Sequence, residues 1–308
     1  MRVVFFGTSE FGVPALTALS AAGFELAAAV TTPEKPRGRG LALQPSPVKA
    51  AAQQSGIAVL EPEDPNAPEF IAQLRELRAD VMVLAAYRFI LKPAVLTVQP
   101  RGCLNIHPSL LPNYRGAAPI QRALMAGEKT TGVSIFLMNE KIDQGDVILQ
   151  QPTEVGPDET GGELSLRLAE VGARLTVEAL RQLEAGDYIR IAQSGPGSYA
   201  AKIAKEERVI DWHQPAARVH NLVRALSPSP AAYTLLHGKR LEILASELVA
   251  EQNGTPGDVA VINRDVLCQA QGGSIRLLRV KPEGGKLMSG IDLVNGKRIA
   301  AGDHLGES

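Results

Sequence analysis

The chain is poor in cysteine and carries almost no net charge. Cys103 and Cys268 are its only cysteines in 308 residues, too few for a disulfide framework, so a reducing compartment is the simpler interpretation. Its 32 basic and 33 acidic side chains nearly cancel. This balance excludes a uniformly basic nucleic-acid binder but leaves room for a local basic patch.

The sequence also lacks long apolar runs and targeting patterns. No stretch reaches the ~18 apolar residues that a membrane helix needs, and the start shows neither a signal-peptide pattern nor an Arg-rich transit segment. We therefore expect a soluble cytoplasmic protein with no membrane partner. With 45% hydrophobic and 21% charged residues, the composition is that of an ordinary globular protein, and the length suits two domains.

Strand and helix periods alternate through the first half of the chain, which predicts a parallel sheet with right-handed crossovers. The run Val81–Ala86 is continuously apolar, as expected for a parallel strand that is covered on both faces. The other strands predicted for this sheet are Val3–Phe6, Leu26–Val30, Ile57–Leu60 and Leu104–His107. Helices are predicted over Glu10–Ala22, Pro47–Gln54, Pro68–Arg78, Ala117–Ala126 and Leu164–Leu183, and Thr131–Met138 and Val147–Val155 look like a hairpin or two neighbouring strands.

The pattern changes after Gln193–Ser198, a stretch with Gly and Pro that is the best linker candidate. Beyond it, one predicted helix (Ala216–Leu226) precedes five short strand-like runs with Gly-containing turns, which suggest a small barrel such as an OB-fold. We therefore predict an α/β protein. Its Rossmann-like parallel-sheet domain spans residues 1–189 and carries the catalytic groups, a linker spans 190–206, and an OB-like β-barrel domain spans 207–308.

The glycines of Gly7–Gly12 follow a strand and open a helix, which is the setting of a nucleotide-binding loop. The dinucleotide fingerprint needs a glycine where this chain has Ser9, and a phosphate-binding loop needs Lys-Ser/Thr where it has Val13-Pro14. We interpret the segment as a tight strand-to-helix turn.

Asn105 and His107 are the strongest candidates for a catalytic site. They share one face of a predicted strand that Pro108 ends, and ligands bind at the carboxyl ends of such strands in open α/β sheets. His107 alone would be read as a structural histidine and Asn105 alone as a turn residue. Together, in an otherwise apolar run, an amide donor and an imidazole could hold a developing oxyanion. The pair suits acyl transfer without a nucleophilic side chain.

Asp143 lies between two predicted strands, where a hairpin turn is the plainer interpretation. Its carboxylate could instead reach His107, orient the imidazole and favour its protonated form. The remaining histidines show no metal-ligand spacing with another His or Cys, so we predict no metal site. The basic residues Lys35, Arg37 and Arg39 lie in a predicted loop over Thr31–Pro45, which is either a solvated surface loop or a phosphate contact beside the site.

The segment Asn105–Pro119 resembles the folate-dependent formyltransferases through its pattern Asn-x-His-x-Ser-Leu-Leu-Pro-x-x-Arg-Gly. Thr131-Gly-Val and Ile142-Asp-x-Gly145 continue the resemblance and indicate the chemistry but not the acceptor. Four further segments are similar to the members of the family that formylate methionyl-tRNA. They are Thr32–Gly40, Pro45–Lys49, Ala201–Glu207 and Ile210–Trp212. The match extends over nearly the whole chain.

This resemblance implies 10-formyltetrahydrofolate as donor and the α-amine of methionine on initiator tRNA as acceptor, for the start of protein synthesis. It implies Asn105, His107 and Asp143 as catalytic residues, and it implies that the 207–308 domain binds tRNA. The folate site would be lined by Ser109, Leu110, Leu111, Pro112 and Arg88, with Arg88 at its rim where a glycine is usual. Lys35, Arg37 and Arg39 would touch the acceptor stem.

Two other functions stay open from the sequence. A sugar-nucleotide N-formyltransferase shares the catalytic motif, but the basic loop and the small second domain argue against it. An inactive RNA-binding regulatory module would have no need for intact Asn105, His107 and Asp143.

Overall fold

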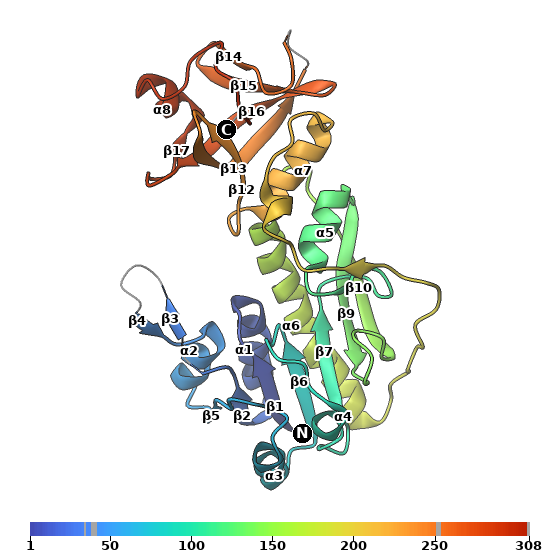
Figure 1. Cartoon of the computed structure of the whole chain (residues 1–308). Coiled ribbons are helices and arrows are strands. Elements are labelled where there is room, and N and C mark those ends of the chain that lie inside the picture. The colour runs from blue at the N-terminus through green and yellow to red at the C-terminus, as the bar shows by residue number, and fades with distance from the viewer. Residues whose placement is uncertain (34, 38–41, 251–253, 307–308) are drawn as a thin grey trace. The chain divides into compact units, whose positions relative to one another are not determined.

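The computed structural model describes residues 1–33, 35–37, 42–250 and 254–306 (Figure 1). The chain divides into two compact units. Unit 1 comprises Met1–Gly116, Thr130–Glu154 and Ser165–Tyr199, and unit 2 comprises Ala117–Lys129, Val155–Leu164 and Ala200–Ser308. Each unit has its own sheet.

Unit 1 is built on a sheet of seven strands in the order β10-β9-β7-β6-β1-β2-β5. The strands from β7 to β5 pair in parallel, whereas β9 pairs antiparallel with both β7 and β10. The sheet is therefore mixed, and the two runs predicted as neighbours form its antiparallel side. The strands are β1 (Arg2–Gly7), β2 (Glu25–Val30), β5 (Val59–Leu60), β6 (Val81–Ala85), β7 (Cys103–His107), β9 (Thr130–Leu137) and β10 (Val147–Glu154).

Helix α2 spans Pro47–Gln54, and the other helices of unit 1 are η1 (Glu10–Gly12), α1 (Val13–Ala21), α3 (Pro68–Glu76) and α4 (Pro93–Leu96). The long helix α6 (Gly161–Ala185) begins in unit 2 and continues in unit 1. Helices α2 and α3 begin at Pro47 and Pro68, as predicted, whereas the predicted Glu10–Ala22 helix divides into η1 and α1, and α4 was not predicted. Ser46 caps α2, since its Oγ accepts a hydrogen bond from the Lys49 N–H at 3.0 Å, and Pro47 takes the first helical position.

The glycines of the Gly7–Gly12 turn are explained by close packing. A Cβ on Gly7 would lie 3.0 Å from Val48 Cγ2 and 3.2 Å from the Ala85 carbonyl oxygen, and one on Gly12 would meet the same oxygen at 3.2 Å. Helix α2 and strand β6 leave no room for side chains there, as expected for a tight turn between β1 and α1.

The two faces of β7 have different neighbours. A Cβ on Gly172 of α6 would collide with Ile106 at 2.6 Å, so α6 covers the Ile106 face. Cys103 belongs to a core cluster with Leu74 of α3 and Val95 of α4. Because side chains alternate along a strand, Asn105 and His107 lie on the same face as Cys103.

Unit 2 contains an antiparallel sheet in the order β12-β13-β16-β15-β14, with β17 added to β16. Trp212 is buried against it, and its Nε1–H donates to Thr234 Oγ1 at 3.0 Å. The predicted fold class, a Rossmann-like α/β domain followed by a β domain, is confirmed. The elements of this unit are α5 (Pro119–Ala126), η2 (Glu206–Arg208), α7 (Ala216–Leu226), β12 (Ala232–Leu236), β13 (Lys239–Val249), β14 (Val259–Ile262), β15 (Asp265–Ala270), β16 (Gly273–Pro282), β17 (Met288–Ser289) and α8 (Gly290–Asn295).

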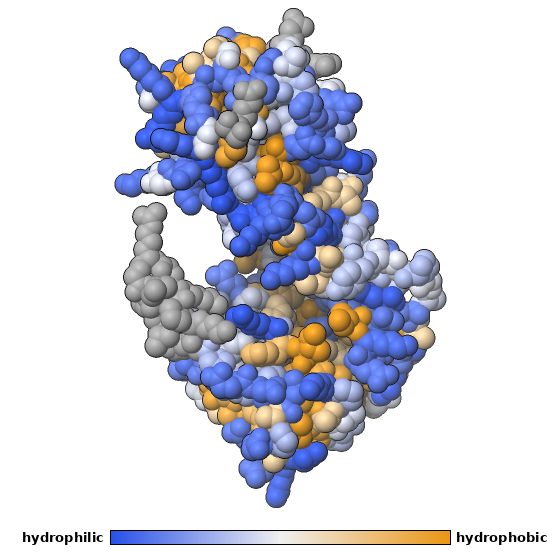
Figure 2. Space-filling model, in the orientation of Figure 1, coloured by the Kyte–Doolittle hydropathy of each residue, from blue (hydrophilic) through white to orange (hydrophobic). Residues whose placement is uncertain are grey.

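Four short strands complete the list of elements. The predicted Thr31–Pro45 loop contains a two-stranded hairpin of β3 (Lys35–Arg37) and β4 (Ala42–Gln44). The other two are β8 (Arg115–Gly116) and β11 (Tyr199–Ala200). Among the described residues, no helix combines the length and the apolar character needed to cross a membrane. On the face that Figure 2 shows, hydrophilic residues predominate and hydrophobic ones form smaller areas. The exposed large hydrophobic residues of unit 1 include Ile90, Ile189 and Ile191.

Candidate active site

The site is centred on the carboxyl end of β7, in the middle of the unit 1 sheet. Asn105 and His107 are 8% and 4% exposed, and they pair across to Phe136 and Ser134 of β9. Within the part of the chain that the structure describes, the Asn105 side-chain amide has no hydrogen-bond partner. Its N–H groups are therefore available to a bound molecule, which is unusual for a nearly buried amide.

His107 is held between a carbonyl oxygen and a carboxylate. Its Nε2 lies 2.9 Å from the Tyr114 carbonyl oxygen, and its Nδ1 lies 3.7 Å from Asp143 Oδ2. Because a carbonyl oxygen only accepts hydrogen bonds, Nε2 carries a hydrogen. In the neutral ring Nδ1 is then a lone pair that faces a carboxylate. The structure thus brings the predicted His107 and Asp143 together, although nothing in their spacing required it.

Burial lowers the pKa of His107 below its ordinary value. The Asp143 carboxylate and the Tyr114 carbonyl act in the opposite direction, since both favour the protonated ring, but burial dominates. His107 is therefore neutral at neutral pH. A proton that arrives at Nδ1 would turn the lone pair into a donor directed at Asp143.

Asp143 occupies a strained loop between β9 and β10. Its φ is 51°, and its Oδ2 accepts a hydrogen bond from the Gly116 N–H at 2.8 Å. Gly145 two residues later has no space for a side chain, because a Cβ would collide with the carbonyl oxygen of Leu137. The glycine of the Ile142-Asp-x-Gly145 motif is thus required by a close backbone approach that fixes the loop under Asp143.

The loop after β7 is tied to β9 by buried polar side chains. Ser109 is fully buried and its Oγ donates to the Asn113 carbonyl at 2.6 Å. Ser134 Oγ donates to the Ser109 carbonyl at 2.6 Å and accepts from the Leu111 N–H at 3.1 Å. Leu111 also packs in a small apolar cluster with Phe136. The loop that the family resemblance assigns to folate is therefore a fixed wall beside His107.

Leu110 and Pro112 close this loop against two glycines. A Cβ on Gly132 would lie 2.5 Å from Leu110 Cδ2, and one on Gly197 would lie 3.0 Å from Pro112 Cβ. Both glycines leave room for the loop after β7 to pack closely against the backbone at residues 132 and 197. Close packing against Leu110 therefore explains the glycine of the Thr131-Gly-Val motif.

Arg88 is exposed to solvent. Its backbone does not have a positive φ; the positive φ of this turn belongs to Ala86, at 48°. Tyr87 between them packs edge-on against Phe6, with ring centroids 5.4 Å apart. A glycine is therefore not needed at position 88 for backbone reasons.

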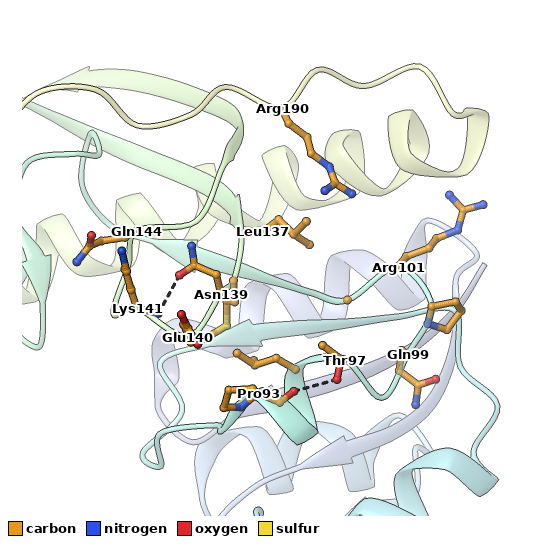
Figure 3. A pocket seen from close by; sticks show the side chains of 14 residues that line it. Pro93, Thr97, Gln99, Arg101, Leu137, Asn139, Glu140, Lys141, Gln144 and Arg190 are labelled. Carbon is orange, nitrogen blue, oxygen red and sulfur yellow. Dashed lines mark hydrogen bonds between the residues drawn. The ribbon is translucent and has the colours of Figure 1, made fainter.

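A cavity of about 740 Å³ adjoins the loop that carries Asp143 (Figure 3). Asn139, Glu140, Lys141 and Gln144 line it from this loop, but Asn105, His107 and Asp143 do not. Figure 3 shows Arg101 and Arg190 on another part of its wall. Basic residues outnumber acidic ones in this lining.

Of the basic loop residues, Lys35 and Arg37 lie on β3 and Arg39 lies outside the described residues. In unit 2, Arg276 forms ion pairs with Glu247 at 2.9 Å and Asp265 at 3.3 Å, and Lys281 pairs with Glu242 at 3.3 Å. These pairs reduce the charge that the β16 strand offers to an anionic partner.

Sequence reasoning missed several residues that hold the site. Ser134 carried a usable signal, as a lone serine in an apolar strand. Tyr114 and Gly116 act through backbone atoms, which no side-chain pattern reveals. Gln193 lies in the predicted linker segment, yet its Nε2–H groups donate to the Asp143 carbonyl at 2.9 Å and the Gly145 carbonyl at 2.8 Å.

Two protein-family models match the chain. One, described as formyl transferase, matches residues 1–180, and the other, described as formyl transferase, C-terminal domain, matches residues 202–298. The three site residues Asn105, His107 and Asp143 all lie in the first match.

The chain is also similar to full-length curated proteins. It is 45% identical over 307 residues to the methionyl-tRNA formyltransferase of Symbiobacterium thermophilum, which covers 98% of this chain and 94% of that protein. It is 43% identical over 309 residues to the methionyl-tRNA formyltransferase of Moorella thermoacetica, which covers 99% of each.

Among solved structures, the fold is similar to an N-formyltransferase from Helicobacter canadensis, determined in complex with folinic acid and dTDP-3-aminofucose. The two align with a TM-score of 0.70 and 17% identity over 90% of this chain and 98% of that one. The likeness concerns the fold alone.

Proposed function

Because the chain belongs to the methionyl-tRNA formyltransferase family, we propose that it transfers a formyl group to the amino group of methionyl-tRNA. The observation that carries this function is the match to relatives of that activity over nearly the whole length of both chains. The buried His107–Asp143 pair beside the free amide of Asn105 gives the activity a chemical basis.

We propose 10-formyltetrahydrofolate as the donor and initiator methionyl-tRNA as the acceptor. The neutral amine attacks the formyl carbon, and the carbonyl electrons move to oxygen. The tetrahedral intermediate then collapses and expels the folate nitrogen. Amino groups of this kind titrate near ~8, so a useful fraction is neutral at neutral pH. The net proton passes from the attacking amine to the departing nitrogen.

Asn105 and His107 act on the two charges of that intermediate. The unpartnered Asn105 amide donates to the oxyanion. His107, neutral at first, accepts the proton that the amine loses, and Asp143 stabilises the imidazolium at Nδ1. The Tyr114 carbonyl keeps the ring oriented through Nε2. In this scheme the low pKa of His107 leaves Nδ1 open as a base.

The folate site is proposed on the same side of the sheet. Ser109 fixes the loop, while Leu110, Leu111 and Pro112 give it an apolar wall suited to a flat ring. Arg88 stands at the rim with its exposed guanidinium available to a carboxylate of the folate tail. The folate donor fits this site because the Asn105 amide and the apolar wall of Leu110, Leu111 and Pro112 lie at the carboxyl end of β7.

The tRNA site is proposed at two places. Lys35 and Arg37 belong to β3, and together with Arg39 they would contact backbone phosphates of the acceptor stem. The 207–308 domain would hold the rest of the tRNA, with residues 1–189 as the catalytic domain and 190–206 as the connection. Support for this division comes from the two family matches, which leave a gap between residues 180 and 202.

The fold does not separate this function from that of a sugar-nucleotide N-formyltransferase. The Helicobacter canadensis enzyme shares the fold over 90% of this chain, so the small β domain no longer argues against a sugar acceptor. Identity does separate them, at 45% for the tRNA enzyme and 17% for that structure.

The test is a formyl-transfer assay with purified protein and labelled 10-formyltetrahydrofolate. Methionyl initiator tRNA, the same tRNA uncharged and a dTDP-amino sugar are offered in parallel. We expect label in formylmethionyl-tRNA only. Transfer to the sugar would establish the alternative acceptor, and binding of tRNA without transfer to any acceptor would indicate an inactive RNA-binding module.

A further inference from the structure

The segment Gln193–Ser198, which reads as a linker, is bonded to both loops of the candidate active site. Ser198 Oγ accepts a hydrogen bond from the Tyr114 N–H at 2.8 Å, and the Ser198 carbonyl accepts one from the Arg115 N–H at 2.9 Å. Both contacts hold the turn whose Tyr114 carbonyl receives His107 Nε2–H. The segment therefore packs against the candidate active site and does not act as a free linker.

Gln193 makes the most connections in this segment. Its Oε1 accepts two hydrogen bonds from the Arg115 guanidinium, from Nε at 3.0 Å and from Nη2 at 2.7 Å. Its Nε2 donates two, to the carbonyl oxygens of Asp143 at 2.9 Å and Gly145 at 2.8 Å. One amide thus joins the His107 loop to the Asp143 loop and uses its donor and acceptor ends in full.

The connection bears on the distance between His107 and Asp143. Asp143 has a φ of 51°, a conformation that costs energy for a residue other than glycine. Its own carbonyl oxygen is one of the two that Gln193 fixes. Without those bonds the loop can relax, and the carboxylate that lies 3.7 Å from His107 Nδ1 loses its support.

We propose that Gln193 is a positioning residue for formyl transfer, which keeps Asp143 in reach of His107 by joining Arg115 to the Asp143 loop. This inference rests on the proposed function for its kinetic consequence, but not for its geometric one. Gln193 touches neither His107 nor the Asp143 carboxylate, so it acts through the backbone that carries them.

Two Gln193 variants and one control test the hydrogen bonds of the Gln193 amide. Gln193→Ala removes all four hydrogen bonds. Gln193→Glu keeps an acceptor for Arg115 but turns an oxygen toward the Asp143 and Gly145 carbonyls, which cannot donate. Gln182→Ala is the matched control, since within the described residues the one hydrogen bond of the Gln182 side-chain amide goes to Glu178 Oε1, at 3.3 Å on the same helix.

We expect kcat to fall about 10-fold in both Gln193 variants, with KM for methionyl-tRNA unchanged. A 10-fold fall matches the free energy of about two lost hydrogen bonds. The control should keep the wild-type kcat.

A double-mutant cycle tests whether Gln193 acts through Asp143. If it does, Gln193→Ala should lower kcat little further in an Asp143→Ala background, because the group that it positions is already missing. A kcat for Gln193→Ala equal to wild type, or a full additional 10-fold loss in the Asp143→Ala background, would overturn the inference.

A second readout does not depend on activity. The His107 ring is titrated by NMR in the wild type and in Gln193→Ala. Since Asp143 raises the pKa of His107, loss of its positioning should move the titration to lower pH. An unmoved titration overturns the positioning role. A moved titration in a protein without formyl-transfer activity would uphold the positioning role and reject the proposed function.

Discussion

His107 Nδ1 lies 3.7 Å from Asp143 Oδ2, a separation too long for a hydrogen bond and short enough for strong charge attraction. Nε2 is occupied by the Tyr114 carbonyl, so a neutral ring turns a lone pair toward the carboxylate. Protonation at Nδ1 replaces this repulsion with attraction. This geometry supports the proposed role of the pair, which is to accept a proton during the reaction rather than to hold one beforehand.

Gly145→Ala should damage both stability and catalysis. The new Cβ would collide with the Leu137 carbonyl oxygen, which is backbone and cannot rotate away. We expect a loss of ~1–3 kcal/mol in the free energy of unfolding, the range for overpacking, and a lower kcat because the loop under Asp143 must move. Denaturant unfolding and steady-state kinetics measure the two effects.

The matched control for this change is Gly296→Ala. There φ is −82° and the nearest atom to a Cβ is the Asp292 carbonyl oxygen at 3.1 Å. It should cost less stability and leave kcat unchanged. Equal effects of the two substitutions would show that the Gly145 contact is not special.

The sequence indicated the candidate catalytic strand because alternation along β7 is a local property. Asn105 and His107 share a face in any regular strand, and Pro108 marks its end. Local helix signals likewise predicted the bounds of α2 (Pro47–Gln54) and α7 (Ala216–Leu226). Asp143 was identified as a candidate through the family resemblance and not through periodicity, because only the fold brings the β9–β10 loop close to His107.

The remaining parts of the site depend on contacts between distant segments. The reversed direction of β9 relative to β7 is a matter of topology that its apolar pattern does not encode. Gln193 lies among Gly, Pro and Ser residues that are typical of a linker, and its partners Arg115 and Asp143 are far away in sequence. Such hydrogen bonds follow from tertiary structure and leave no local signal.

Arg88→Gly tests the edge of the folate site. Because Arg88 is exposed and lacks a positive φ, a glycine should not alter the pocket backbone in the folded enzyme. We expect an unchanged kcat and a rise in donor KM of at most ~10-fold, the scale of one charge-assisted contact. A collapse of kcat would place the guanidinium at the reacting atoms and reject the folate site as drawn.

Neutralisation of the basic loop should weaken tRNA binding through charge. Lys35→Ala, Arg37→Ala and Arg39→Ala remove potential phosphate contacts, and each lost contact should reduce the slope of log K against log salt by about one unit. Donor binding should stay the same. If the slope of the triple variant equals that of the wild type, the loop is a solvated surface loop.

His220 of α7 should make unit 2 less stable in mild acid. The ring is buried, with Nδ1 3.1 Å from Ser246 Oγ and Nε2 3.3 Å from Asp158 Oδ1, and burial lowers its pKa despite Asp158. The unfolded chain binds the proton more readily, so stability is full above the unfolded pKa of ~6.5 and falls as the pH drops below it. In His220→Gln the unfolding temperature should fall less between pH 7.5 and 5.5. Parallel curves for variant and wild type would count against this assignment.

The most direct test of the account is single-turnover formyl transfer to methionyl-tRNA by His107→Ala. Circular dichroism and thermal unfolding first establish that the variant is folded, and tRNA and donor are supplied at saturation. We expect a rate at least ~100-fold below wild type, the scale of losing a positioned general base, with a comparable loss in Asp143→Ala. A folded His107→Ala protein that transfers formyl groups at a near-normal rate would contradict it.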